Sequence, residues 1–269
     1  MPKVVITGAA GGIAQATARL LWQKGYQLVL TDISEAILQK AYPHLPAGSM
    51  QEILDVTDLS AWEALLERHK DAAILLQTAG IMRVANFIDQ PIEEWHLQQR
   101  VNLTGLVYGC WVFGRHFAQR RSGHIINIAS MAGVAPVPGV VGYTATKFGV
   151  RGLSLALDME LRPQGVPVTV ICPGPVATPL IFNELPKPES IYTMVMGGLL
   201  TPEAVAEAIW RAIRRRPREI LIPGYKAIAA RLVSLFPSLL GIVPPLLRPG
   251  AARRREEYLK TLRTLQSQT

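Results

Sequence analysis

Short runs of β-branched and aliphatic residues alternate with longer amphipathic stretches along most of this chain. Parallel strands that are buried on both faces have this continuous apolar pattern, and a crossover helix follows each of them. The alternation therefore predicts an α/β fold with a doubly wound, mostly parallel sheet of about seven strands, right-handed crossovers and helices on both faces. The expected strands are 3–7, 27–31, 49–54, 73–77, 123–128, 167–171 and 219–222, and the expected helices are 12–24, 34–42, 59–69, 91–121, 143–161 and 201–214.

The length and composition suit one large globular domain followed by an appendage. The chain has 269 residues, of which 49% are apolar and 18% are charged, so disorder and coiled coil describe it poorly. We expect the domain to cover residues 1–222 and the appendage 223–269. In the appendage, an apolar segment broken by prolines (227–247) precedes a basic helix candidate (251–265).

Cysteine usage and the first residues bear on the compartment. Cys110 and Cys172 each stand alone in an apolar context, without the spacing of a disulfide framework or a zinc site. We therefore expect no metal and a reducing, cytoplasmic setting. Met1 leads directly into the first expected strand, and no signal peptide is evident.

A glycine-rich turn links the first expected strand to the first expected helix. Its residues are Thr7-Gly8-Ala9-Ala10-Gly11-Gly12-Ile13-Ala14. Glycines let the backbone approach a pyrophosphate closely, and the helix that follows presents N–H groups to it. Such turns are also ordinary connectors, but the strand before and the helix after favour a dinucleotide site. The loop lacks the Gly-Lys-Ser/Thr of a nucleoside triphosphate site, so the sequence does not indicate ATP hydrolysis.

Asp32 ends the second expected strand, at the distance from the glycines where a carboxylate reaches the adenosine ribose hydroxyls. A carboxylate there repels a 2′-phosphate, and the loop holds no lysine or arginine that would attract one. The sequence therefore favours NAD over NADP. The alternative interpretation is a carboxylate that only introduces the helix beginning after Ile33.

Tyr143 and Lys147 are four residues apart at the start of an expected helix, which places both on one face. A tyrosine has an unperturbed pKa of about 10, and a nearby cation can lower such a value by roughly 1 to 3 units. Lys147 and an oxidised nicotinamide would supply two cations, so a phenolate general base comes within reach near neutrality. Alone, the pair is as consistent with a packed ring and a solvated amine. Ser130, however, closes an expected strand at the edge where doubly wound sheets bind ligands.

Taken together, these motifs resemble the short-chain dehydrogenase/reductases, in the compact branch of that family, over roughly residues 1–222. The family has a Rossmann fold, and its order of motifs is the specific part of the resemblance. The matching positions are Thr7 to Ala14, Asp32, Asp55-Val56, Ala79-Gly80, Asn102, Ser130, Tyr143 with Lys147, and Pro173-Gly174-Pro175-Val176-Ala177-Thr178.

The resemblance implies a role for each position. Tyr143 would be the general acid/base, Ser130 the donor to the substrate oxygen, and Lys147 the residue that grips the nicotinamide ribose and lowers the tyrosine pKa. Asn102 would hold a water for proton relay, a role compatible with a buried helix asparagine bonded to backbone. The implied cofactor contacts are Gly8, Gly12, Ile13, Asp32, Asp55, Val56, Ala79, Gly80, Tyr143, Lys147, Pro173, Gly174, Val176 and Thr178.

Two positions depart from the family pattern. Ala14 replaces the third glycine of the loop, and as a small residue it should still allow the helix to pack closely on the strand. Gln77-Thr78-Ala79-Gly80 stands where the family often has Asn-Asn-Ala-Gly. The asparagine bonding between central strands must therefore be replaced, and we expect altered local support without loss of the chemistry.

The segment 180–200 follows the Pro-Gly motif, where such enzymes usually choose their substrate. Its apolar content predicts a lipophilic alcohol or ketone, such as a steroid, a retinoid or a long-chain compound. Packing of the same side chains on the core or in a dimer interface is the competing interpretation. The apolar residues are Leu180, Ile181, Phe182, Leu185, Tyr192, Met194, Val195, Met196, Leu199 and Leu200.

Positive charge gathers at the C-terminus. Residues 1–210 have 15 Lys/Arg against 17 Asp/Glu, net −2, whereas residues 211–269 have 13 against 3, net +10. The sixteen uncharged residues 232–247 are too few and too broken by proline to cross a bilayer, for which about 20 are needed. The flanking Arg231, Arg248 and the triplet Arg253-Arg254-Arg255 suggest peripheral contact of 227–269 with an anionic membrane. A flap that covers the pocket or joins subunits, with solvated arginines, is an equal alternative.

Three functions follow from the sequence as hypotheses. The first is an NAD-dependent alcohol dehydrogenase or carbonyl reductase, in a family that is usually a homodimer or homotetramer. The second is a non-catalytic nucleotide-binding scaffold at a membrane, against which the set of Ser130, Tyr143 and Lys147 argues. The third, an epimerase or dehydratase of the extended branch, needs a longer C-terminal substrate domain. No nucleic-acid partner is expected, because the basic tail matches no recognised module.

Overall fold

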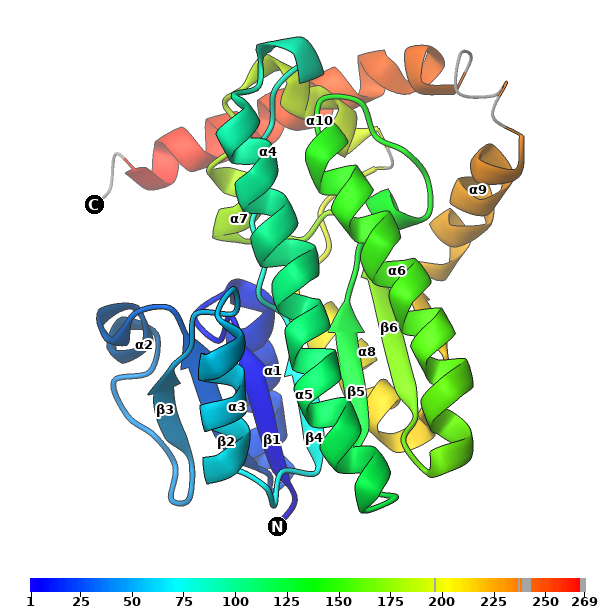
Figure 1. Ribbon diagram of the computed structural model, residues 1–269. Coiled ribbons are helices and arrows are strands. Elements are labelled where there is room, and N and C mark those ends of the chain that lie inside the picture. The colour runs from blue at the N-terminus through cyan, green and yellow to red at the C-terminus, as the bar shows by residue number, and fades with distance from the viewer. Residues whose placement is uncertain (196, 237, 239–242, 267–269) are drawn as a thin grey trace.

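The computed structural model describes residues 1–195, 197–236, 238 and 243–266. These residues form a seven-stranded sheet in which every pairing is parallel and the strand order is β3-β2-β1-β4-β5-β6-β7 (Figure 1). The predicted fold class is confirmed. The strands are β1 (Lys3–Thr7), β2 (Gln27–Asp32), β3 (Met50–Ile53), β4 (Ile74–Gln77), β5 (His124–Ile128), β6 (Val168–Pro173) and β7 (Glu219–Ile222).

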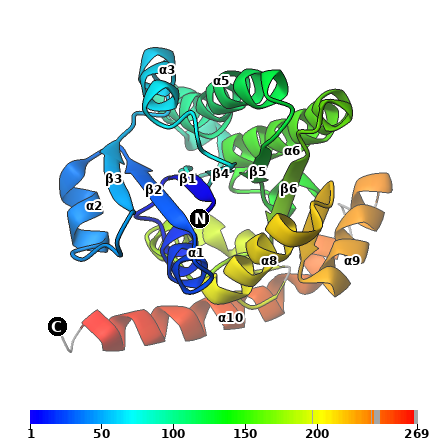
Figure 2. The ribbon, with the colours of Figure 1, turned by 90° about the horizontal axis from the view of Figure 1, so that it is seen from below.

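Helices cover both faces of the sheet. Figure 2 shows α1 and α8 on one face and α3, α5 and α6 on the other. The α-helices are α1 (Gly12–Gln23), α2 (Glu35–Ala41), α3 (Leu59–Arg68), α4 (Ile92–Gln99), α5 (Gly105–Gln119), α6 (Val141–Leu161), α7 (Pro179–Phe182), α8 (Pro202–Arg215), α9 (Gly224–Leu235) and α10 (Val243–Gln266). Short 3₁₀ helices are η1 (Phe87–Asp89), η3 (Met131–Gly133), η4 (Arg162–Gln164) and η5 (Pro188–Met194).

One expected helix, 91–121, is interrupted in the structure. It begins at Ile92, passes through a π-helical turn at Arg100–Thr104 (η2), and continues as α5 to Gln119. The turn contains Asn102, whose side chain bonds to the backbone of Ile81. An inserted π turn rotates the residues that follow it, and such turns frequently occur at functional sites. A periodicity of apolar residues cannot show this local change.

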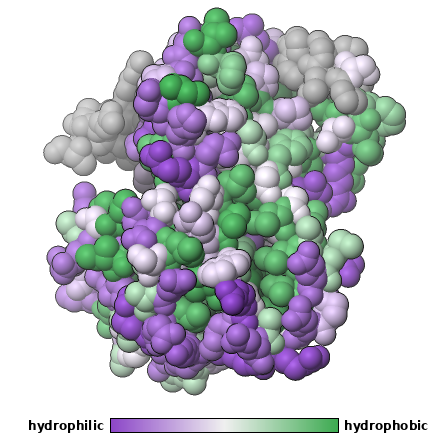
Figure 3. All heavy atoms as spheres, in the orientation of Figure 1, coloured by the Kyte–Doolittle hydropathy of each residue, from purple (hydrophilic) through white to green (hydrophobic). Residues whose placement is uncertain are grey.

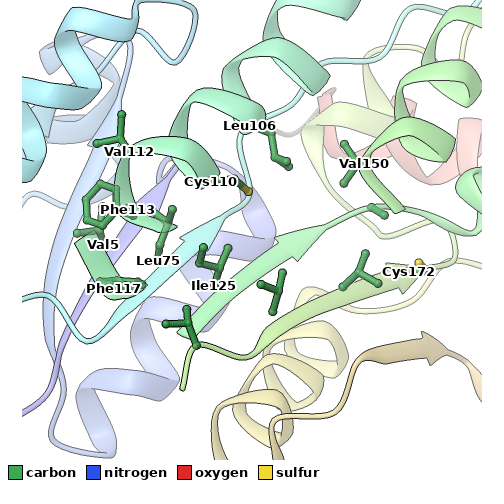
Figure 4. Close-up of a cluster of buried hydrophobic side chains, with 14 of the residues drawn as sticks. Val5, Leu75, Leu106, Cys110, Val112, Phe113, Phe117, Ile125, Val150 and Cys172 are labelled. Atoms are coloured by element: carbon green, nitrogen blue, oxygen red, sulfur yellow. The ribbon is translucent and has the colours of Figure 1, made fainter. Parts of the chain in front are cut away.

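Two hydrophobic cores hold the helices on the sheet. Figure 4 shows the core beneath α5, where Phe113, Phe117 and Cys110 pack over Val5, Leu75 and Ile125 of the strands. On the opposite face, Ala14, Ala18 and Leu21 of α1 pack with Val205 and Ile209 of α8 over β1 and β2. Ala14 is fully buried there, which accounts for the small residue at this position of the loop.

A third apolar cluster lies beyond the carboxyl ends of the strands. Its buried members include Ile181, Leu185 and Met194, with Ala251 of α10 packed against them. Tyr143 is a partly buried member of the same cluster. The segment 180–200 and α10 therefore form one small packed unit above the edge of the sheet where the predicted site residues lie, as Figure 1 shows for α7 and α10.

The C-terminal part differs from its expected organisation. The segment 227–247, described from the sequence as apolar and broken by prolines, contains most of α9, and α10 begins at Val243 instead of residue 251. Pro244 and Pro245 stand in the first turn of α10, where a helix does not need their missing N–H groups. Part of the predicted membrane-contacting stretch, residues 237 and 239–242, lies outside the described residues. Among the described residues, no helix is long and apolar enough to cross a membrane.

Candidate active site

The loops that follow four adjacent strands bring the predicted site residues to one edge of the sheet. Gly8 follows β1, Gly80 follows β4, Ser130 follows β5 and Gly174 follows β6. The strand order reverses at β1 and β4, and in open α/β sheets the crevice at such a switch point is where ligands bind. The topology therefore places these residues where a dinucleotide crevice is expected.

The backbone of the glycine loop approaches neighbouring residues so closely that side chains would not fit at Gly8 and Gly12. Gly8 has a φ of +63°, and a Cβ there would lie 2.6 Å from the Cα of Ala79. A Cβ on Gly12 would lie 2.8 Å from Cγ2 of Thr178. Four predicted cofactor positions, from the segments that follow β1, β4 and β6, therefore converge at the N-terminus of α1. No side chain caps that helix, so its end can receive a pyrophosphate.

Asp32 lies at the end of β2 and faces the glycine loop. One of its carboxylate oxygens accepts a hydrogen bond from the backbone N–H of Ala10 (3.0 Å), and the other accepts one from Ile33 (2.8 Å). The carboxylate is thus fixed beside the loop, and its bond to Ile33 also fits the alternative that it introduces the next helix. Both interpretations of Asp32 agree with this geometry.

Tyr42 is a support of the loop that the sequence did not indicate. Its hydroxyl donates a hydrogen bond to the carbonyl of Ala9 at 2.6 Å. Burial raises the pKa of Tyr42 above its ordinary value and keeps the phenol protonated, although the positive charge of Arg19 opposes this shift. Tyr42 lies 33 residues beyond Ala9 in the chain, so no local pattern could have linked them.

Asp55 and Val56 follow β3, next to Asp32 in the sheet. Asp55 accepts hydrogen bonds from the backbone N–H and the hydroxyl of Thr57, each 2.8 Å long. The carbonyl of Val56 accepts a bond from the indole of Trp62 (3.0 Å). These contacts fix the loop on the side of the crevice where we expect the adenine, but neither residue lines the pocket beside Tyr143.

Ser130, Tyr143 and Lys147 come together as predicted from their spacing. The hydroxyls of Ser130 and Tyr143 are hydrogen-bonded to each other, and Ser130 also accepts a bond from the N–H of Ala132 (3.1 Å). Lys147 is buried, and its Nζ donates to the carbonyl of Ile128 at 2.9 Å. The same Nζ lies 5.5 Å from the centre of the Tyr143 ring. The phenol, the hydroxyl and the amine therefore share one site.

The pKa of Tyr143 differs from the sequence expectation. Removal of water from the phenol raises its pKa to about 12, and the hydrogen bond with Ser130 lowers it only in part. Burial also lowers the pKa of Lys147 to about 8, so the amine is a weaker cation than expected. Desolvation, which disfavours the charged form of both groups, therefore dominates both pKa values, and the predicted lowering of the tyrosine pKa by Lys147 does not occur in this structure.

Asn102 lies behind this site in the π-helical turn. Its side chain accepts a bond from the N–H of Ile81 and donates one to the carbonyl of the same residue, each at 2.8 Å. A further bond, to the hydroxyl of Thr146, is 3.2 Å long. A Cβ on Gly80 would lie 3.3 Å from Oδ1 of Asn102 and 3.6 Å from Nζ of Lys147. Asn102 therefore anchors the loop after β4 beside the lysine.

Gln77 stands where the family often has an asparagine that bonds between the central strands, and its side chain makes such bonds instead. Its Nε2 donates to the side-chain oxygen of Asn127 on β5 (3.0 Å) and to the carbonyl of Leu106 on α5 (3.2 Å). Asn127 in turn donates to the hydroxyl of Ser154 on α6 (2.9 Å). A longer amide side chain thus links the two central strands to both helices above them, and the local support is altered as expected.

An apolar pocket opens beside Tyr143. Its walls come from the loops after β4, β5 and β6, from the segment 180–200, and from Ala230 and Val233 of α9. Leu180, Ile181, Tyr192 and Val195 line it, whereas Leu185 and Met194 are buried in the third apolar cluster. Some residues of the segment therefore line the pocket and others pack in the core, so each of the two interpretations holds for part of the segment. Met196 lies outside the described residues. The predicted cofactor residues in the wall are Ile13, Gly80, Tyr143, Lys147, Pro173, Gly174, Val176 and Thr178.

The sequence left a flap of residues 227–269 over the pocket as one of two equal alternatives, and Ala230 and Val233 of α9 do line the pocket. No group of three or more His, Cys, Asp or Glu side chains that could hold a metal occurs in the part of the chain that the structure describes. The residues at the crevice instead fit a dinucleotide, through the cradle of Gly8 and Gly12 and the uncapped end of α1.

Comparison with known proteins agrees with the fold. The profile of the short chain dehydrogenase family matches residues 2–188. A 3-alpha-(or 20-beta)-hydroxysteroid dehydrogenase of Mycobacterium tuberculosis is 31% identical over 209 residues, which cover 76% of this chain and 79% of that protein. The protein described as "Probable oxidoreductase EphD" of the same organism is 36% identical over 186 residues, or 66% of this chain. The match spans only 31% of the length of that relative.

A solved structure gives the same result. A short chain dehydrogenase/reductase from Burkholderia phymatum, in complex with NAD, superimposes with a TM-score of 0.78 at 26% sequence identity, covering 89% of this chain and 95% of that chain. The doubly wound sheet and the loops at its carboxyl edge define a Rossmann-fold protein. The chain belongs to the short-chain dehydrogenase/reductase family.

Proposed function

We propose that this protein interconverts a lipophilic secondary alcohol and its ketone, with a nicotinamide dinucleotide as cofactor and Tyr143 as general acid/base. The observation that carries the proposal is the joint site of Tyr143, Ser130 and Lys147 at the wall of an apolar pocket. The similarity to a hydroxysteroid dehydrogenase supports the same reaction class.

The proposed cofactor site extends from the glycine loop to the loop after β6. Gly8 and Gly12 would hold the pyrophosphate, and Ile13 would contact it from the first turn of α1. Asp55, Val56 and Ala79 would border the adenosine half, while Pro173, Gly174, Val176 and Thr178 would border the nicotinamide half. A bound nicotinamide dinucleotide would accept or supply the hydride.

The chain's own residues would move the proton. With its raised pKa, Tyr143 is protonated near neutrality, and in this form it donates to a carbonyl oxygen. In the oxidation direction the phenolate accepts the proton of the alcohol. Ser130 would hold the substrate oxygen, Lys147 would bind the ribose and stabilise the phenolate, and Asn102 would position a water for proton relay.

We infer a preference for NAD over NADP from Asp32. Its carboxylate is fixed beside the glycine loop by two backbone N–H groups, so a 2′-phosphate at this position would meet a negative charge that cannot move away easily.

The lipophilic substrate is inferred from the pocket wall. The residues that line the pocket are mainly apolar and include Met82, Val137 and Leu180 as well as Ser130 and Tyr143. Such a wall favours an apolar body that carries one oxygen function. Steroid, retinoid and long-chain secondary alcohols are the classes that it fits.

A substrate screen tests the proposal. Purified protein is incubated with lipophilic secondary alcohols and NAD or NADP, and the absorbance of the reduced nicotinamide is followed; ketones with the reduced cofactors test the reverse direction. We expect turnover of at least one lipophilic class and a higher kcat/KM with NAD. Turnover of small polar alcohols only would contradict the substrate class.

A further inference from the structure

The three consecutive arginines of α10 have different environments. The side chain of Arg253 is 84% exposed and forms an ion pair with Glu257 on its own helix. Arg254 and Arg255 are partly buried, and their guanidinium groups donate hydrogen bonds to the segment 180–200. The sequence interpretations, a membrane-facing or a solvated triplet, are therefore wrong for two of the three side chains.

Arg255 bonds to the middle of this segment. Its Nε donates to the hydroxyl of Ser190 (2.8 Å) and to the carbonyl of Leu185 (3.1 Å), and its terminal nitrogen donates to the carbonyls of Pro186 (2.8 Å) and Lys187 (3.2 Å). An arginine presents five N–H donors in one plane, so a single side chain can bind several carbonyls of one turn. Arg255 thus connects the turn between α7 and η5 with Ser190 of η5.

Arg254 and Tyr258 bind the distal part of the same segment. Arg254 donates two hydrogen bonds to the carbonyl of Met194, at 2.9 and 3.3 Å. The hydroxyl of Tyr258 accepts a bond from the N–H of Leu199 at 3.1 Å. Ala251 is fully buried against the same apolar cluster. One face of α10 therefore holds the segment from Leu185 to Leu199.

The residues that α10 holds are next to those that line the pocket. Tyr192, Thr193 and Val195 form part of the pocket wall, and they lie between or beside Ser190 and Met194. The base of the segment is closed by hydrogen bonds between Ala177, Leu200 and Pro175. The segment is thus held at its base by these backbone bonds. Along the rest of its length it is held by the side chains of α10.

We propose that Arg254, Arg255 and Tyr258 are positioning residues that fix the substrate lid, residues 180–200, over the pocket. They determine the affinity for the substrate through the lid without touching the substrate themselves. The proposal rests on the proposed function in one respect, namely that this pocket receives the substrate. The C-terminal helix is then a component of the substrate site.

The experiment compares Arg254→Ala and Arg255→Ala with Arg253→Ala, a matched loss of charge on the same helix turn. Hydrogen exchange of lid amides is measured in the absence of substrate, together with cofactor affinity and the KM and kcat of the best substrate from the screen. We expect Arg255→Ala and Arg254→Ala to speed lid exchange and raise KM by at least about tenfold each, because charge-assisted hydrogen bonds are lost. The kcat and the cofactor affinity should change little.

Arg255→Lys serves as the conservative variant and should restore lid protection only in part, because an ammonium cannot bind four acceptors in the same fork geometry. Tyr258→Phe removes one acceptor alone and gives a second variant if an arginine substitution prevents folding. The proposal is overturned if Arg255→Ala and Arg253→Ala have the same lid exchange and the same KM. If no alcohol is turned over, the proposed function fails, while lid exchange still decides whether α10 fixes the lid.

Discussion

Tyr143 and Lys147 are each shifted toward their neutral forms. Burial raises the pKa of Tyr143 to about 12 and lowers the pKa of Lys147 to about 8, because the surrounding protein solvates charge poorly. Any additional positive charge near the phenol stabilises the phenolate and moves the tyrosine pKa back toward neutrality. The pair is thus sensitive to the charge of whatever binds in the crevice, which is the property we propose the enzyme uses.

His124 provides a test of burial that is independent of the active site. It begins β5 and is 1% exposed, and burial lowers its pKa to about 3. As the pH falls below about 6.5, the unfolded chain binds a proton at this histidine, whereas the folded chain does not. The free energy of unfolding therefore decreases as the pH falls from about 6.5 to about 3.

We expect His124→Gln to reduce this pH dependence, whatever its effect at neutral pH. Urea unfolding at a series of pH values from 7 to 4 gives the comparison. His44→Gln, a substitution of an exposed histidine, is the control and should keep the native slope. Parallel pH profiles for the His124 variant and the native protein would show that His124 does not carry the effect.

Asp32→Ser tests the proposed cofactor preference at a single residue. Removal of the carboxylate abolishes the repulsion of a 2′-phosphate, so the ratio of kcat/KM for NADP to that for NAD should rise by roughly tenfold or more. Asp55→Ser removes a carboxylate from the next loop and serves as the control, with a smaller expected change. An unchanged ratio in Asp32→Ser would contradict the proposed role of this residue.

At the scale of elements, the sequence predicted strands better than the C-terminal helices. The bounds of β1 and β7 agree with the prediction, because each strand is a compact apolar run. The π-helical turn at Asn102 and the length of α10 were not predicted, since both depend on contacts between parts of the chain that are far apart. Pro244 and Pro245 also suggested an interruption of the apolar segment, whereas in the structure they lie in the first turn of α10.

Helix α9 has an exposed apolar stripe opposite its buried face, and Figure 3 shows hydrophobic surface at the right edge of the molecule, where α9 lies. Tyr225, Ile228, Leu232 and Leu235 are 73, 66, 47 and 71% exposed, whereas Ala230 on the other face is fully buried. We propose that this stripe makes the peripheral contact with an anionic membrane that the sequence suggested, supported by the net charge of +10 in residues 211–269.

Binding to vesicles of phosphatidylcholine and phosphatidylserine measures this contact. The double substitution Ile228→Glu and Leu235→Glu should weaken binding by at least about tenfold, because two exposed apolar side chains lose their burial in lipid. Met159→Glu, which changes a 72% exposed residue of α6, is the control. Equal binding of the double variant, or absence of binding by the native protein, would contradict the membrane contact.

At the scale of the whole molecule, the sequence predicted which loops meet but not how they are supported. Parallel strands place all carboxyl ends at one edge, so motifs after β1, β4, β5 and β6 had to come together. The bond from Tyr42 to Ala9 and those from Arg255 to the lid join residues far apart in the chain, and no spacing rule predicts them. The expected assembly into a homodimer or homotetramer stays a prediction, as does the cytoplasmic setting.

The most direct test of the account is the turnover of Tyr143→Phe with the best substrate from the screen. Loss of the phenolic proton should lower kcat by roughly 10²- to 10⁴-fold, the range for a general acid/base, and leave cofactor affinity unchanged. Tyr225→Phe, at an exposed position of α9, should keep native activity. A Tyr143→Phe variant that turns over substrate at the native rate would contradict the proton role on which the proposed function depends.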